Sequence, residues 1–223
     1  MHLFLVRTPG LDRMWHLHPA VKGGAFDDDL PSVDAGHYKV FADVVDKSGF
    51  PWTLVGTIDL PAISGHALSG DDSEGSAPPI QAAANSNVST LVDGTRVIWD
   101  RDATPLKPNV PMFLKFEVQD PTGKPAQDLE PYMGMAAHVE IIRDDLSVFA
   151  HIHPSGSIPM ASLMMASADS GASSMTGMSM PGEKIAPEIS IPYGFPQSGR
   201  YRIFLQFKRA GKIETAVFDT EVK

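Results

Sequence analysis

The sequence predicts an all-β protein made of two related β-sandwich repeats, the first of them incomplete at its N-terminal end. Three observations predict this class. Apolar and polar residues alternate over short segments bounded by turn residues, and no segment has a helical period. A pattern of one His, a short loop and then His-x-His-Pro occurs twice. A Gly-x-Tyr strand start follows each copy, at Gly36 and at Gly199.

The first repeat is expected to span residues 1–60. Its strands are expected over residues 1–7, 13–18, 36–45 and 52–60. Four strands are about half of a sandwich and leave apolar faces and edges open. We therefore expect a truncated N-terminus, and packing of this repeat on preceding residues, on the second repeat or on another chain.

Residues 61–87 are rich in Ala, Ser, Gly and acidic residues and have few large apolar side chains. This composition is typical of a flexible linker, in which Asp71, Asp72 and Glu74 would be solvated. The second repeat is expected to be complete over residues 88–223. Its strands are expected over residues 89–92, 95–99, 111–119, 137–143, 148–153, 199–207 and 212–222, with a hairpin turn at Asp93-Gly94.

A Met-rich insertion interrupts the second repeat at residues 155–187. It holds six of the eleven methionines, namely Met160, Met164, Met165, Met175, Met178 and Met180. The surrounding Ser, Ala and Gly cannot form a core. Thioether sulfur is a ligand that Cu(I) prefers, and the alternative is an adaptable contact surface without metal.

The histidines of the second repeat are expected to converge on one face of a hairpin. Side chains alternate along a strand, so His151 and His153 share a face about 7 Å apart. With a two-residue turn at Asp144-Asp145, His138 falls opposite His151, at roughly 5 Å between Cβ atoms. The first repeat offers the same trio in His2, His16 and His18, with Gly10 expected as the left-handed residue of a bulged loop.

Three imidazoles with an open fourth position suit copper, and zinc as a second choice. Met135 follows in the same region and could add a thioether ligand that favours Cu(I). Two alternatives stay open. His-x-His-Pro can be a structural corner repeated by duplication, and Met135 can simply fill space in the sandwich.

Composition excludes several classes of protein and site. The chain has no cysteine, which rules out disulfides, thiolate zinc sites and a Cys-ligated copper centre. Its net charge of −9 argues against nucleic acid or an anionic membrane as partner. No apolar run is long enough to span a membrane, and the first residues are too short for a signal peptide.

No nucleophile triad, phosphate loop or nucleotide motif is present in the sequence. Glu140 is the one acidic residue on the expected histidine face, where it could orient an imidazole. The chain is therefore not expected to be an enzyme, although two copper sites could in principle activate oxygen.

Three segments carry a resemblance to a known class of proteins. They are residues 118–125, residues 132–138 with 151–154, and residues 195–201. On these the chain resembles tandem immunoglobulin-like domains of bacterial secreted or periplasmic proteins, of the kind associated with copper and heavy-metal handling. The resemblance covers the second repeat well and the first in part. It implies a periplasmic or secreted location and a metal-linked context, with the two histidine trios as candidate ligands.

The sequence thus predicts a periplasmic or secreted metal-binding module that sequesters or delivers copper. The alternative is a non-catalytic accessory subunit of a larger extracytoplasmic assembly. In that case the histidines would be structural, and the incomplete first repeat would dock on a protein partner.

Overall fold

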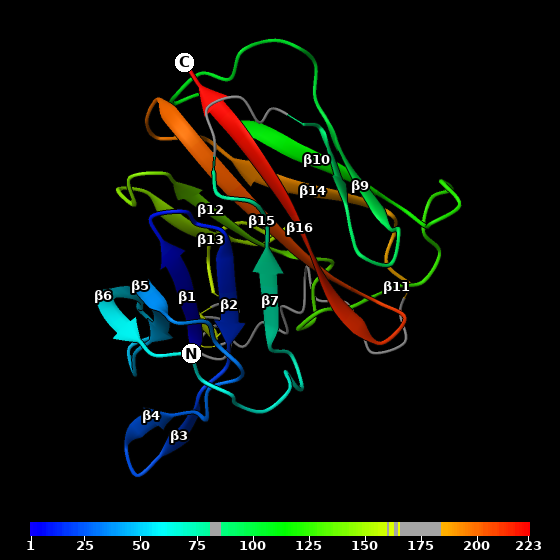
Figure 1. Ribbon diagram of the computed structural model, residues 1–223. Helices are drawn as coiled ribbons and strands as arrows, with labels where there is room; N and C mark the ends of the chain where they lie inside the picture. The colour runs from blue at the N-terminus through cyan, green and yellow to red at the C-terminus, as the bar shows by residue number, and fades with distance from the viewer. Residues whose placement is uncertain (81–85, 160, 163–164, 166–183) are drawn as a thin grey trace. The chain divides into compact units, whose positions relative to one another are not determined.

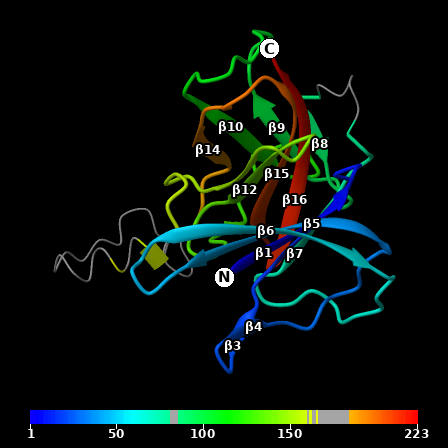
Figure 2. The same ribbon diagram turned by 90° about the vertical axis from the view of Figure 1, so that its left-hand side faces the viewer.

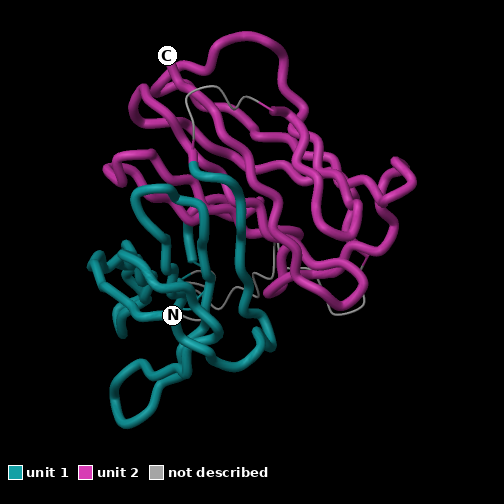
Figure 3. Tube along the Cα trace, viewed as in Figure 1, with its two compact units in different colours: residues 1–79, 158–175 teal, residues 80–157, 176–223 magenta. Residues whose placement is uncertain are grey.

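The computed structural model describes residues 1–80, 86–159, 161–162, 165 and 184–223. Strands β1 to β16 are assigned among these residues, and Figure 1 labels all of them except β8. Ala161, Ser162 and Met165 are helical. The strands confirm the predicted all-β class. The chain divides into two compact units, shown in Figure 3. Unit 1 comprises Met1–Pro79 and Ile158–Met175, and unit 2 comprises Ile80–Ser157 and Thr176–Lys223.

Unit 1 is built on a five-stranded antiparallel sheet with the order β6-β5-β1-β2-β7. Its strands are β1 (His2–Thr8), β2 (Arg13–Leu17), β5 (Gly36–Val45), β6 (Pro51–Leu60) and β7 (Ser73–Ser76). A separate hairpin consists of β3 (Ala20–Lys22) and β4 (Ala25–Asp27). Strands β5 and β6 pair along their full length, as Figure 2 shows from the side.

One face of this sheet carries the small core of unit 1. Leu5, Trp15, Leu17 and Tyr38 project from three strands because alternate residues share a face. Loop segments cover them, since Val33 lies in the same core and exchanges two backbone hydrogen bonds with Ile63.

Strand β7 corrects the expectation of a flexible linker over residues 61–87. It forms an antiparallel ladder with β2, and Ser73 and Gly75 are buried. A strand that has no large side chains can still be held in a sheet by backbone hydrogen bonds. Small residues also allow a neighbouring backbone to approach closely. The Ser-Gly-rich composition that predicted mobility therefore gave no signal of this pairing.

Unit 2 is a β-sandwich of two antiparallel sheets. One sheet has the order β14-β10-β9-β8, and the other has β11-β15-β12-β13 with β16 on β15. The first sheet contains β8 (Val88–Thr90), β9 (Arg96–Asp100), β10 (Met112–Gln119) and β14 (Glu188–Tyr193). The second contains β11 (Leu129–Glu130), β12 (His138–Arg143), β13 (Phe149–Ile152), β15 (Gly199–Arg209) and β16 (Lys212–Val222).

The core of unit 2 lies between these sheets. Trp99 and Phe116 come from one sheet and Phe218 from the other, with ring centroids 5.3–6.0 Å apart. All three side chains are at most 2% exposed. Alternating aliphatic residues of β10, β12 and β15 fill the space around them.

The two units share a strand order and a tyrosine corner. The order β6-β5-β1-β2 of unit 1 matches β16-β15-β12-β13 of unit 2. Tyr38 donates a hydrogen bond to the carbonyl of Asp34 at 2.7 Å, and Tyr201 donates one to that of Gln197 at 2.8 Å. Both tyrosines thus bond to a backbone four residues upstream, as in immunoglobulin-like domains. The tandem repeat stays a prediction with which these features agree.

Candidate metal centre

The histidine hairpin of unit 2 has a different register from the expected one. Strands β12 and β13 pair Glu140 with His151, so His138 does not lie opposite His151. The loop holds four residues rather than two, because the amide of Arg143 donates to the carbonyl of Val148. Asp145 accepts bonds from the amide and hydroxyl of Ser147 and so favours this wider loop. A shift of two residues leaves each side chain on its expected face.

The trio His138, His151 and His153 therefore still converges. Nδ1 of His138 lies 3.1 Å from Nε2 of His151. The ring of His153 has its centroid 4.6 Å from each of the other two. One ring nitrogen from each histidine lies within 4.8 Å of the other two. Nitrogens bound to one tetrahedral metal at about 2.0–2.1 Å would be roughly 3.3 Å apart, so small side-chain rotations suffice.

Burial and one backbone contact fix this trio. His138 is 2% exposed and His153 is 4% exposed. Nε2 of His138 lies 3.3 Å from the carbonyl oxygen of Tyr132. Because a carbonyl only accepts, this contact places the proton on Nε2 and the lone pair of Nδ1 toward His151.

The hairpin of unit 1 also brings together the rings of His2, His16 and His18. Leu3 pairs with Leu17, which places His2 across from His18. Nδ1 of His2 lies 2.8 Å from Nε2 of His16, so the same two atom types face each other as in unit 2. Ring centroids are 5.1 Å apart for His2 and each partner and 4.6 Å apart for His16 and His18.

The loop of this hairpin corrects a second expectation. Leu11, rather than Gly10, adopts the left-handed conformation, with φ of 49°. Its amide donates to the carbonyl of Arg7 at 2.9 Å, and its side chain is fully buried. Burial of this side chain offsets the modest cost that a non-glycine residue has there.

An acidic residue that sequence analysis placed in solvent belongs to the unit 1 trio. Oδ1 of Asp72 lies 3.0 Å from Nδ1 of His18 and accepts the backbone amide of His18 at 2.9 Å. Burial lowers the pKa of His18, against a smaller opposing effect of Asp72. A neutral imidazole is the form that binds metal. The 54 residues between the partners explain why no local pattern predicted the contact.

Two other predicted participants have defined surroundings. Met135 is 3% exposed, and its sulfur lies 3.9 Å from the hydroxyl of Ser155, in the turn that follows His153. Glu140 is fully buried on the histidine face of β12, across from His151. A thioether ligand and a carboxylate that orients an imidazole stay predictions for these residues.

The predicted methionine ligands of the insertion mostly lie outside the described residues. This holds for Met160, Met164, Met175, Met178 and Met180. Met165 is described and is 39% exposed.

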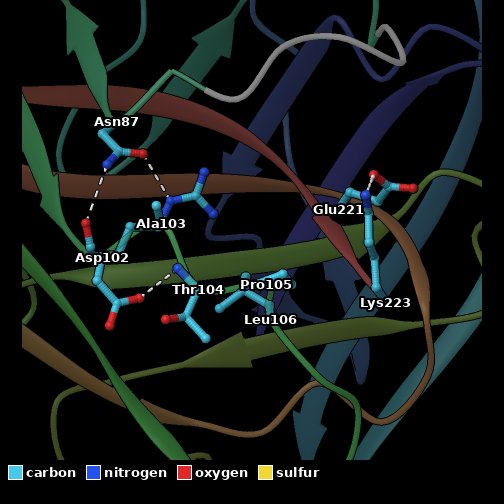
Figure 4. Close-up of a pocket in the computed structure, with 9 residues that line it drawn as sticks. Asn87, Asp102, Ala103, Thr104, Pro105, Leu106, Glu221 and Lys223 are labelled. Carbon is cyan, nitrogen blue, oxygen red and sulfur yellow. Dashed lines mark hydrogen bonds and ion pairs between the residues drawn. The ribbon is translucent and has the colours of Figure 1, made fainter.

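A polar surface pocket of about 570 Å³ lies at the other end of the unit 2 sheet from the trio (Figure 4). It adjoins the Gly199–Val222 pair, whereas His138 pairs with Gln206. Its charged groups bind within the protein, since Arg101 donates to Asn87 and Thr220 and Lys223 pairs with Glu221. These internal contacts make the pocket a weaker candidate than the histidine trios.

Fold and site thus define an all-β protein with a histidine trio on one hairpin of each unit. The chain belongs to the family described as "Domain of unknown function (DUF8832)", whose model matches residues 90–223. A search of curated proteins finds no match.

Among solved structures, the chain is similar to the soluble domain of PmoD from Methylocystis sp. (Rockwell). The two are 16% identical with a TM-score of 0.31, over 61% of this chain and 96% of that chain. So distant a likeness carries no argument about this protein. Among the described residues, no helix is long and apolar enough to cross a membrane.

Proposed function

We propose that this chain is a metal-binding protein whose unit 2 trio, His138, His151 and His153, binds copper, with zinc as the second choice. The observation that carries the proposal is the convergence of three ring nitrogens within 4.8 Å of one another on one hairpin. Imidazole suits both ions, and at sites of this type Cu(II) generally binds more tightly than Zn²⁺.

Comparison of the two trios supports metal binding over a purely structural role. One N–H···N bond needs two rings, yet each hairpin brings a third ring to 4.6 Å from a neighbour. The three rings also gather on the unit 1 hairpin, although the two loops differ in length and sequence. In unit 2 three ring nitrogens lie within 4.8 Å of one another, which a metal requires and a structural corner does not.

The proposed role is to hold or deliver the ion rather than to catalyse a reaction. The sequence has no nucleophile triad, phosphate loop or nucleotide motif of the kind that enzymes use. The absence of cysteine agrees with a periplasmic or secreted protein, where thiols oxidise. We propose this location and the non-enzymatic role together.

One observation favours a second candidate function, that of an accessory subunit of a larger assembly. Trp52, Leu54, Val55 and Ile58 of β6 are each more than two-fifths exposed. Exposed apolar side chains gathered on one strand mark interaction surfaces in many proteins. A protein partner of this kind would be compatible with copper delivery.

The first test is metal retention by the untagged chain. After exposure to equimolar copper and zinc and desalting, native mass spectrometry counts the bound ions. We expect the wild type to retain copper, and the triple variant His138→Ala/His151→Ala/His153→Ala to retain one copper fewer per chain. His37→Ala is the matched control, because His37 is exposed and pairs with Asp59 on the surface.

Two results would contradict the proposal. One is a wild-type chain that retains neither metal, which would leave the histidines as architecture. The other is a triple variant that retains as much copper as His37→Ala. Thermal unfolding of all three proteins shows whether the alanines preserve the fold, so loss of metal is not confused with unfolding.

A further inference from the structure

We infer that Asp72 is the positioning residue of the unit 1 trio and strengthens the preference of that trio for Cu(II) over Cu(I). The inference rests on the proposed function, since it requires that the trios bind copper. It adds a residue outside the histidine pattern and assigns a chemical role to the charge of that residue.

The contact with Asp72 fixes both the tautomer and the direction of the His18 ring. A carboxylate only accepts, so its contact of 3.0 Å places the proton of His18 on Nδ1. The lone pair is then on Nε2, which is buried and has no hydrogen-bond partner among the described residues. The ring lies beside those of His16 and His2. His18 thus has a ligand atom ready for a metal.

The register of β7 explains why Asp72 reaches this position. Ser73 pairs with His16 on β2, so Asp72, the residue directly before β7, arrives beside Leu17 and His18 because the two strands are antiparallel. The Asp72 amide donates to the carbonyl of Ser69, and its side chain is 14% exposed. The same carboxylate oxygen also accepts the backbone amide of His18. Asp72 is therefore held before any ion binds.

The group that orients the His18 ring is a carboxylate, which adds a charge as well as a hydrogen-bond acceptor. A carboxylate makes imidazole a stronger donor and adds a negative charge near the ion. Both effects stabilise a doubly charged ion more than a singly charged one. Asp72 should therefore increase the affinity of unit 1 for Cu(II) more than its affinity for Cu(I).

The test is Asp72→Asn in a chain that also carries His153→Ala, which removes one ligand of the unit 2 trio. Asparagine keeps an oxygen that can accept both hydrogen bonds and removes only the charge. We expect Cu(II) affinity at unit 1 to fall about 10–100-fold, and Cu(I) affinity to fall less. For each factor of ten by which the loss of Cu(II) affinity exceeds the loss of Cu(I) affinity, the reduction potential of the bound copper rises by about 59 mV.

Asp59→Asn in the same background is the matched control, since it removes the same charge from an exposed side chain that pairs with His37 rather than with a trio histidine. It should leave the potential within a few millivolts of the parent. Equal potentials for the two variants would overturn the inference while copper binding still stood, and so would equal losses of Cu(I) and Cu(II) affinity. If the chain that carries His153→Ala alone binds no copper at unit 1, the inference is overturned. If the wild type binds no copper at either trio, the proposed function is overturned as well.

Discussion

Phe116→Ala should destabilise unit 2 by about 3–5 kcal/mol, because it removes a buried aromatic ring and leaves a cavity. Phe116 is 1% exposed, and its ring packs between those of Trp99 and Phe218. Neither neighbour can close the gap easily, since both rings are fixed from opposite sheets. Urea unfolding followed through the indole resonance of Trp99 measures the loss within this unit.

Phe113→Ala is the matched control for that substitution. Phe113 is the same residue type on the same strand β10, but it points to the other face and is 60% exposed. Its loss should cost less than about 1 kcal/mol. Similar losses for the two variants would contradict the placement of the sandwich core, because only Phe116 faces it.

Glu214→Gln should stabilise unit 2 by about 2 kcal/mol above pH 7 and have little effect near pH 4. Burial, with a further contribution from the charge of Asp93, raises the pKa of Glu214 from 4.5 to about 7. In the unfolded chain the group ionises near its ordinary pKa. Its contribution to stability is therefore complete below about pH 4.5, falls as the pH rises, and is lost above about pH 7.

Glutamine at this position does not ionise and its amide can still donate to Asp93. The pKa difference corresponds to about 3 kcal/mol at most, and partial exposure reduces this to about 2 kcal/mol. Urea unfolding at pH 4 and pH 8 measures the effect. Glu221→Gln, on an exposed part of the same strand, should change stability by less than about 0.5 kcal/mol at both pH values. An equal gain at both pH values would refute the buried-carboxyl explanation.

Local sequence predicted the strands because the relevant physics is local. Alternation along β10 and β15 and the turn at Asp93-Gly94 each depend on a few neighbouring residues. The histidine trios also followed from alternation, and even a wrong loop length shifted the register by an even number of residues. For this reason His138, His151 and His153 were found without knowledge of the true pairing.

Features that depend on distant pairing were not predictable in the same way. Strand β7 has no apolar alternation, and its place beside β2 is decided by backbone hydrogen bonds across more than fifty residues. Asp72 was misjudged for the same reason, because its role depends on where β7 lies. Leu11 was missed because a buried leucine replaces the glycine that its backbone conformation usually favours.

Strand β6 ends the unit 1 sheet and has one paired side. It is hydrogen-bonded to β5 along ten residues, and no strand of the described chain lies beyond it. In an antiparallel ladder every second residue directs its amide away from the paired neighbour. Deuterium uptake along β6 should thus be periodic, with fast and slow amides in strict alternation. If another strand pairs with β6 and extends the sheet, the fast-exchanging amides, which point away from β5, should become protected.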